Sequence, residues 1–68
     1  MVATERQKEW LKDAWQAWVD MAGTDEEWLL RERLDAGLDA IGVSSGRKEQ
    51  IFACRSFRAV KPLIDWLD

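Results

Sequence analysis

Histidine and tyrosine are absent from this 68-residue sequence, and cysteine and proline occur once each. With a single cysteine the chain cannot form an internal disulfide, and without histidine a structural zinc site lacks its usual ligands. The lack of histidine also removes the commonest general base near neutral pH. We therefore expect no metal centre and no cofactor, and we expect that the protein is not an enzyme.

Long apolar runs are missing as well, and no stretch approaches the roughly 20 residues that cross a bilayer. The first residues, "MVATERQ", lack the basic region and apolar stretch of a secretory signal. A lone thiol, Cys54, is typical of a reducing compartment. These features predict a cytoplasmic protein that does not enter a membrane.

The apolar content of 47% is ordinary for a globular domain, but the chain is short. A domain of this size buries only about 60% of the surface that its unfolded chain exposes. Small domains usually add a disulfide, a metal or a partner subunit to compensate. Since the first two are not expected here, the sequence predicts a single domain over 1–68 that forms a homodimer.

Apolar residues recur with the helical period, and the glycines fall mostly between the periodic segments. Helices are expected at about 4–22, 25–41 and 46–60, with a short C-terminal helical turn at 62–67. The sequence thus predicts an all-α fold with three helices and a terminal turn.

Residues with specific roles at helix ends set these boundaries. Two Thr-x-x-Gln/Glu pairs have the spacing of capping boxes, and two glycines suit the left-handed position after a helix: Thr4 with Gln7, Thr24 with Glu27, Gly23 and Gly42. Pro62 is expected to end the third helix and to begin the final turn. Gly37, inside the second helix, indicates close helix packing.

Three of the five tryptophans lie in the first helix, in the segment "EWLKDAWQAWVDMAG". Its apolar arc spans roughly 200° of the helical wheel, whereas about 100° is enough to face a core. Because neighbours within one chain cannot cover so wide an arc, we expect Trp10, Trp15 and Trp18 to form a dimer interface. Trp66 in the terminal turn is assigned to the same interface, although the turn can pack on its own chain or on the partner.

Trp28 falls among charged residues on the far side of the second helix. In one interpretation it folds back over the interhelical turn onto Met21 and Ala22. In the other it is an exposed anchor for a protein partner, a role in which tryptophan is over-represented.

Residues 46–61 carry five basic side chains and one acid, although the whole chain has a net charge of −3. On a single helix these cations would share one side. We therefore take Arg47, Lys48, Arg55 and Arg58 as candidate partner-binding residues. They can instead face the acidic sides of the first two helices.

A third interpretation of this segment is a helix-turn-helix that places the third helix in the major groove of DNA, with "IGVS" as its turn. The apolar residue expected after that turn arrives three positions late, at Ile51. The acidic net charge also disfavours generic nucleic-acid binding.

Cys54 is next to Arg55, which favours a reactive thiolate, but cysteine is usually buried and no base partner exists. Two hypotheses therefore emerge. The first is a homodimeric helical module that binds and regulates or inhibits another protein. The alternative is a small DNA-binding regulator that uses the basic third helix.

Overall fold

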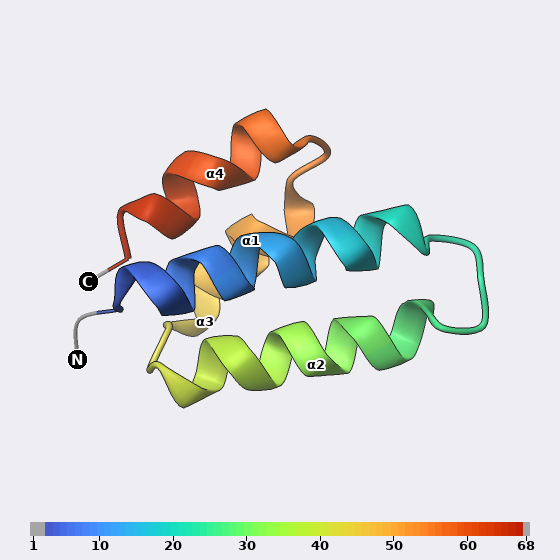
Figure 1. Ribbon diagram of the computed structural model, residues 1–68, viewed down its shortest axis with the longest axis horizontal. Helices are drawn as coiled ribbons and strands as arrows, with labels where there is room; N and C mark the ends of the chain where they lie inside the picture. Colours follow the sequence, from blue (N-terminus) through green and yellow to red (C-terminus); the bar gives the residue numbers. More distant parts are fainter. Residues whose placement is uncertain (1–2, 68) are drawn as a thin grey trace.

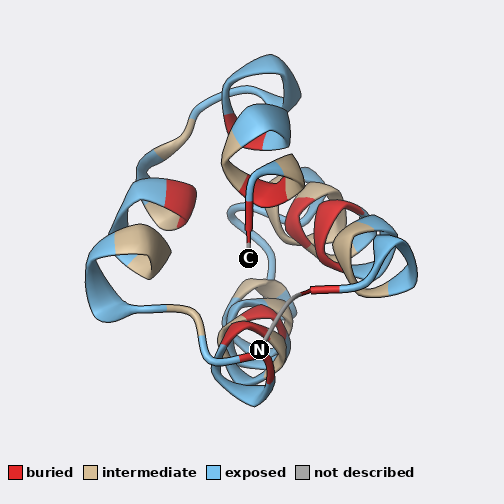
Figure 2. Ribbon diagram, turned by 90° about the vertical axis from the view of Figure 1, so that its left-hand side faces the viewer, coloured by how far each residue is buried: buried red, intermediate tan, exposed pale blue. Residues whose placement is uncertain are grey.

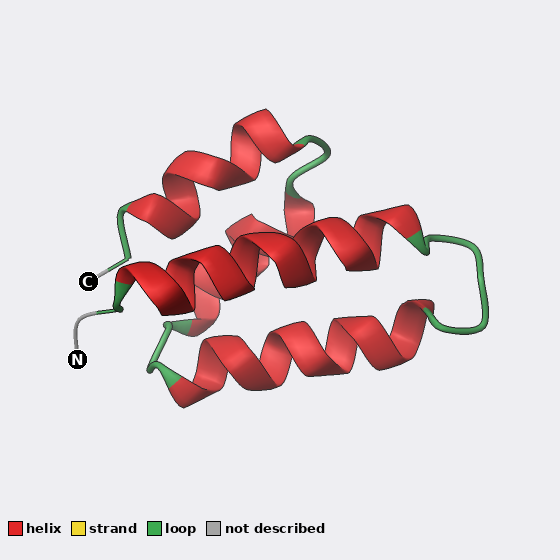
Figure 3. Ribbon diagram, in the orientation of Figure 1, coloured by secondary structure: helices red, strands yellow, loops and turns green. Residues whose placement is uncertain are grey.

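The computed structural model describes residues 3–67, which form four helices joined by short turns (Figures 1 and 3). In chain order the helices are α1 (Glu5–Asp20), α2 (Glu27–Ala40), α3 (Ser45–Ala53) and α4 (Phe57–Asp65). The described residues contain no strand, and the expected all-α fold is confirmed. No helix in this range is long and apolar enough to cross a membrane.

The four helices surround one core, as the end-on view shows (Figure 2). α1 lies between α2 and α4 and runs antiparallel to both (Figure 1). α3 lies across the core from α1 (Figure 2). Buried side chains from all four helices meet in the centre, the largest being Trp15, Leu11, Leu34, Leu38, Ile51, Ile64 and Val60. The first and last described residues, Ala3 and Leu67, line the same hollow and so lie at one end of the molecule.

Local sequence signals account for the helix ends. Thr4 and Gln7 form the expected capping box at the start of α1, and Gly23 and Gly42 have φ values of 85° and 78°. The second expected box is displaced: α2 begins at Glu27, whose carboxylate accepts a hydrogen bond from the Gly23 amide. The Thr24 hydroxyl donates instead to the Met21 carbonyl at 2.6 Å.

The helix predicted over 46–60 is wrong in its extent, because the chain leaves the helical conformation after Ala53. Cys54 is extended, and Ser56 then begins α4 by accepting a hydrogen bond from the Ala59 amide at 3.2 Å. A serine oxygen in this position offers the backbone an N-cap in place of a continued helix. The break removes the single helix on which the basic residues were expected to align.

Pro62 also differs from its prediction, since it lies inside α4 and does not begin a separate turn. An interior proline costs a helix about 3 kcal/mol. Val60 and Ile64, on either side of it, have no exposed surface, and burial of each is worth about 1.5–3 kcal/mol. Packing of α4 onto the core therefore outweighs the proline.

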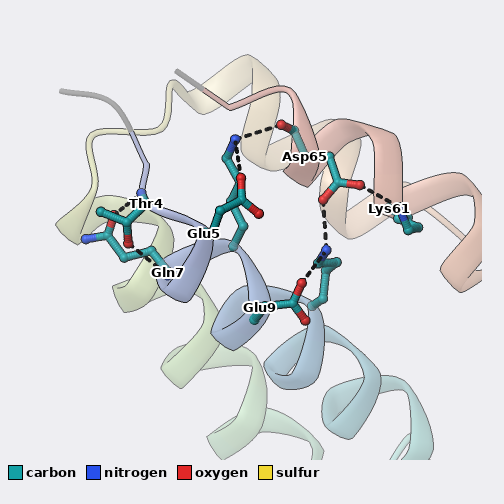
Figure 4. A network of polar contacts seen from close by, with 8 residues as sticks. Thr4, Glu5, Gln7, Glu9, Lys61 and Asp65 are labelled. Atoms are coloured by element: carbon teal, nitrogen blue, oxygen red, sulfur yellow. Dashed lines mark hydrogen bonds and ion pairs between the residues drawn. The ribbon is translucent and has the colours of Figure 1, made fainter.

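α4 is held on α1 by a network around Asp65 (Figure 4). The ammonium groups of Lys12 and Lys61 lie 2.8 and 2.7 Å from its two carboxylate oxygens, and Lys8 donates to its backbone carbonyl at 2.8 Å. Hydrogen bonds from Lys12 and then from Lys61 lower the pKa of Asp65 from 3.8 to about 2. Lys12 is buried and also pairs with Glu9 at 3.0 Å; its hydrogen bond to Asp65, followed by that to Glu9, raises its pKa.

Candidate interaction surfaces

The side of the α1–α2 pair that faces away from α3 and α4 carries exposed apolar side chains. We call it the outer α1–α2 face; helical spacing places on it Trp10, Ala17 and Met21 from α1, and Leu29, Arg33, Ala36 and Ala40 from α2. Trp10, Met21 and Leu29 are 38%, 40% and 52% exposed. The face thus joins three large apolar side chains with small alanines between them.

Trp10 is fixed in position by its contacts with α2. Its indole fills the space that a Cβ atom at Gly37 would need, which confirms that the glycine permits close helix packing. The Arg33 guanidinium lies 5.3 Å from the centroid of the same ring. Beside it is a hollow of about 220 Å³ with mainly apolar walls, lined by Gln7, Trp10, Leu11, Gly37, Ala40 and Ile41.

The structure divides the wide apolar arc of α1 between this face and the core. Trp15 is only 1% exposed, and its indole nitrogen donates to the Ile51 carbonyl at 3.2 Å. Its assignment to a dimer interface is therefore corrected: Trp15 is a core residue that ties α1 to α3. The helical wheel of α1 could not show this, because the partner helix of each side was unknown.

Trp18 is half-buried and packs edge-to-face with Phe52 of α3, with ring centroids 5.3 Å apart. Its indole nitrogen is buried and has no hydrogen-bond acceptor among the described residues. Most of its surface is used within the chain, so it offers less to a partner than Trp10.

Trp66 caps the C-terminus of α4 and is 78% exposed. It borders a hollow of about 220 Å³ where the two chain ends meet the α2–α3 turn; Val43, Arg47 and Leu67 also line this hollow. The neighbouring Leu67 is buried in the core, so the terminal segment packs on its own chain.

The predicted basic residues do not form one surface. The Lys48 ammonium lies between Asp39 at 2.6 Å and Asp35 at 3.1 Å, and hydrogen bonds to Asp39 and then Asp35 raise its pKa. Lys48 thus faces the acids of α2, as one interpretation held, and is removed from the partner-binding set. Arg55 and Arg58 are exposed at the α3–α4 turn, whereas Arg47 is half-buried near the chain ends.

Trp28 does not bury the interhelical turn, because Met21 and Ala22 are exposed and Trp28 itself is 59% exposed. It lies on the α3 side of α2, above a hollow of about 320 Å³ that it shares with Arg31, Glu32 and Asp35. The exposed placement is the one required of a partner anchor.

Cys54 has the properties of an unreactive thiol. It is half-buried, its Sγ donates to the Gln50 carbonyl at 3.2 Å, and burial raises its pKa. A raised pKa lowers the thiolate fraction on which nucleophilic attack depends. Within residues 3–67 no group of His, Cys, Asp or Glu side chains is arranged to hold a metal ion.

Comparison of the chain with protein-family models, with curated proteins and with solved structures found no match.

Proposed function

We propose that this protein is a helical interaction module that forms a homodimer through its outer α1–α2 face and, as a dimer, binds and modulates another protein. The observation that carries the proposal is the exposure of Trp10, Met21 and Leu29 on one side of a chain whose core is already filled. Large apolar side chains exposed together on one side of a small domain are typical of interaction sites. A reducing, cytoplasmic location fits the unpaired thiol of Cys54.

The size of the face sets the expected strength of the dimer. A helix of 16 residues is about 24 Å long, and two helices packed about 9 Å apart form a strip about 20 Å wide. The two copies together would then bury about 1,000 Å², near the lower limit of specific interfaces. We expect a dimer that dissociates on dilution in the micromolar range.

The charges around the face suit self-association. Arg6 and Arg33 provide positive charge along it, while Asp13 and Asp20 provide negative charge on the outward side of α1. In a two-fold dimer each copy presents the same patch to the other, so only a patch with both signs can place unlike charges opposite each other. A face of one sign would repel its copy.

Substitution on the face tests the dimer. Leu29→Glu and Ala36→Glu each place a charge where the second copy would pack, and we expect sedimentation equilibrium to show a shift toward monomer of at least tenfold in the dissociation constant. Ala59→Glu, an exposed alanine on α4, is the matched control and should dimerise normally. Equal dimerisation by all three variants would overturn the proposed face.

The alternative function, binding of duplex DNA, retains Arg55 and Arg58 as exposed cations. It loses Lys48, which is paired with α2. A titration with duplex DNA at two salt concentrations decides it: binding that weakens steeply with salt and on Arg55→Ala would favour the regulator over the protein-binding module.

A further inference from the structure

A groove runs between α2 and α3 on a side of the molecule separate from the outer α1–α2 face. It consists of the hollow at Trp28 and a second hollow of about 490 Å³, and the two share Arg31 and Asp35 as lining residues. Glu49 and Phe52 of α3 line the second hollow. The two hollows therefore adjoin at Arg31 and Asp35, with Trp28 lining the first and α3 lining the second.

The cations of the groove are already engaged within the chain. Lys48 is held by Asp35 and Asp39, and the Arg31 guanidinium lies over the Phe52 ring, 4.6 Å from its centroid. The exposed carboxylates of Glu32 and Glu49 form no ion pair with any residue in the range 3–67. Arg31 and Lys48 keep their positive charges, but the lining acids Glu32, Asp35 and Glu49 outnumber them, so the side chains that line the two hollows carry a net charge of −1.

Trp28 differs from Phe52 of the groove and from Trp10 of the outer α1–α2 face. Phe52 and Trp10 each carry an arginine over one face, whereas no cation of the described chain lies over Trp28. Its indole is more than half exposed beside Glu32, one helical turn further along α2. An open tryptophan face next to a carboxylate is the arrangement that binds a guanidinium, by stacking and by ion pairing together.

We propose that the α2–α3 groove binds a basic segment of a partner protein, with an arginine side chain stacked on Trp28 and paired with Glu32. An acidic segment would be repelled by the carboxylates of Glu32 and Glu49, so charge complementarity selects the basic one. This inference rests on the proposed role in protein binding but not on the dimer. It assigns the partner surface to Trp28 and the acids of α2, and not to the basic residues of α3 and α4.

The test uses fluorescence anisotropy with the full chain and a fluorescein-labelled short peptide of arginine, leucine and alanine. We expect the peptide to bind, and its counterpart with glutamate in place of arginine not to bind. Trp28→Leu keeps the apolar surface but removes the indole face, and should weaken binding about two- to fivefold. Glu32→Gln should weaken it about two- to threefold.

Matched controls separate the groove from general attraction to an acidic protein. Trp66→Leu removes another exposed tryptophan and Glu5→Gln another exposed acid, and both should bind the peptide like the unaltered chain. Equal losses in the controls and in the groove variants, no effect of Trp28→Leu, or no binding at all would each overturn the proposal. Binding by a chain that sediments as a monomer would refute the dimer alone; dimerisation without peptide binding would refute the groove alone.

Discussion

Gly37 is the residue on which the packing of α1 against α2 depends most directly. Alanine favours a helix over glycine by about 1 kcal/mol, but a methyl group here would overlap the Trp10 ring. Overpacking of this kind costs about 1–3 kcal/mol, so we expect Gly37→Ala to lower the free energy of unfolding in a urea titration.

Gly46 provides the control for this substitution, because a Cβ at this position of α3 would meet no atom. Gly46→Ala should leave stability unchanged or raise it by about 0.4–1 kcal/mol. Equal effects of the two substitutions would mean that the Trp10 contact does not constrain position 37.

The ion pairs of Asp65 make the free energy of unfolding depend on pH in acid. The pKa of Asp65 falls from 3.8, the ordinary value, to about 2 in the folded chain. Folding therefore stabilises the ionised form of this carboxylate relative to the protonated form. The contribution is complete above the unfolded pKa and is lost as the pH falls toward 2. We expect the urea midpoint to decrease across this window.

Asp65→Asn should be less stable than the unaltered chain at neutral pH and should lose part of the decrease in acid. If the variant shows the same acid dependence as the unaltered chain, other carboxylates are responsible. The pH dependence due to Lys12 has the opposite sign. Its pKa is raised above 10.5, so its contribution to stability is lost as the pH rises through the folded-state pKa.

At the scale of the helices, the break between α3 and α4 depends on Ser56. Its side chain caps α4, and loss of an N-cap costs about 0.5–2 kcal/mol. We expect Ser56→Ala to lower the free energy of unfolding by about 1 kcal/mol. Ser45→Ala, at an exposed position in the first turn of α3, should change it much less; an equal effect would argue against the cap.

Helix ends that depend on neighbouring residues could be predicted from the sequence. The Thr4–Gln7 box and the left-handed Gly42 after α2 involve contacts within a few residues, and the structure confirms them. Gly23 is also left-handed, but α1 already ends at Asp20 and has Met21 as its C-cap. The break at Cys54 and the passage of α4 through Pro62 could not be predicted, because both depend on which side chains reach the core.

At the scale of the whole molecule, the sequence predicts that the arc of α1 has more apolar surface than its own chain uses, but not which residues are in excess. Trp10 and Trp15 both belong to this arc, about 140° apart on the helical wheel, and only the positions of α2 and α3 place one on the surface and the other in the core. The ion pairs of Lys48 with Asp35 and Asp39 could not be predicted from the sequence either, because the sequence does not specify the angle between α2 and α3.

The dimer is the central claim, and the mass of the unaltered protein in solution as a function of concentration tests it most directly. Light scattering after size exclusion should give a mass that rises from 7.9 kDa at high dilution toward twice that value as the concentration passes through the micromolar range. A mass that stays at 7.9 kDa up to millimolar concentration would contradict the account, and the outer α1–α2 face would not be a surface for a second copy.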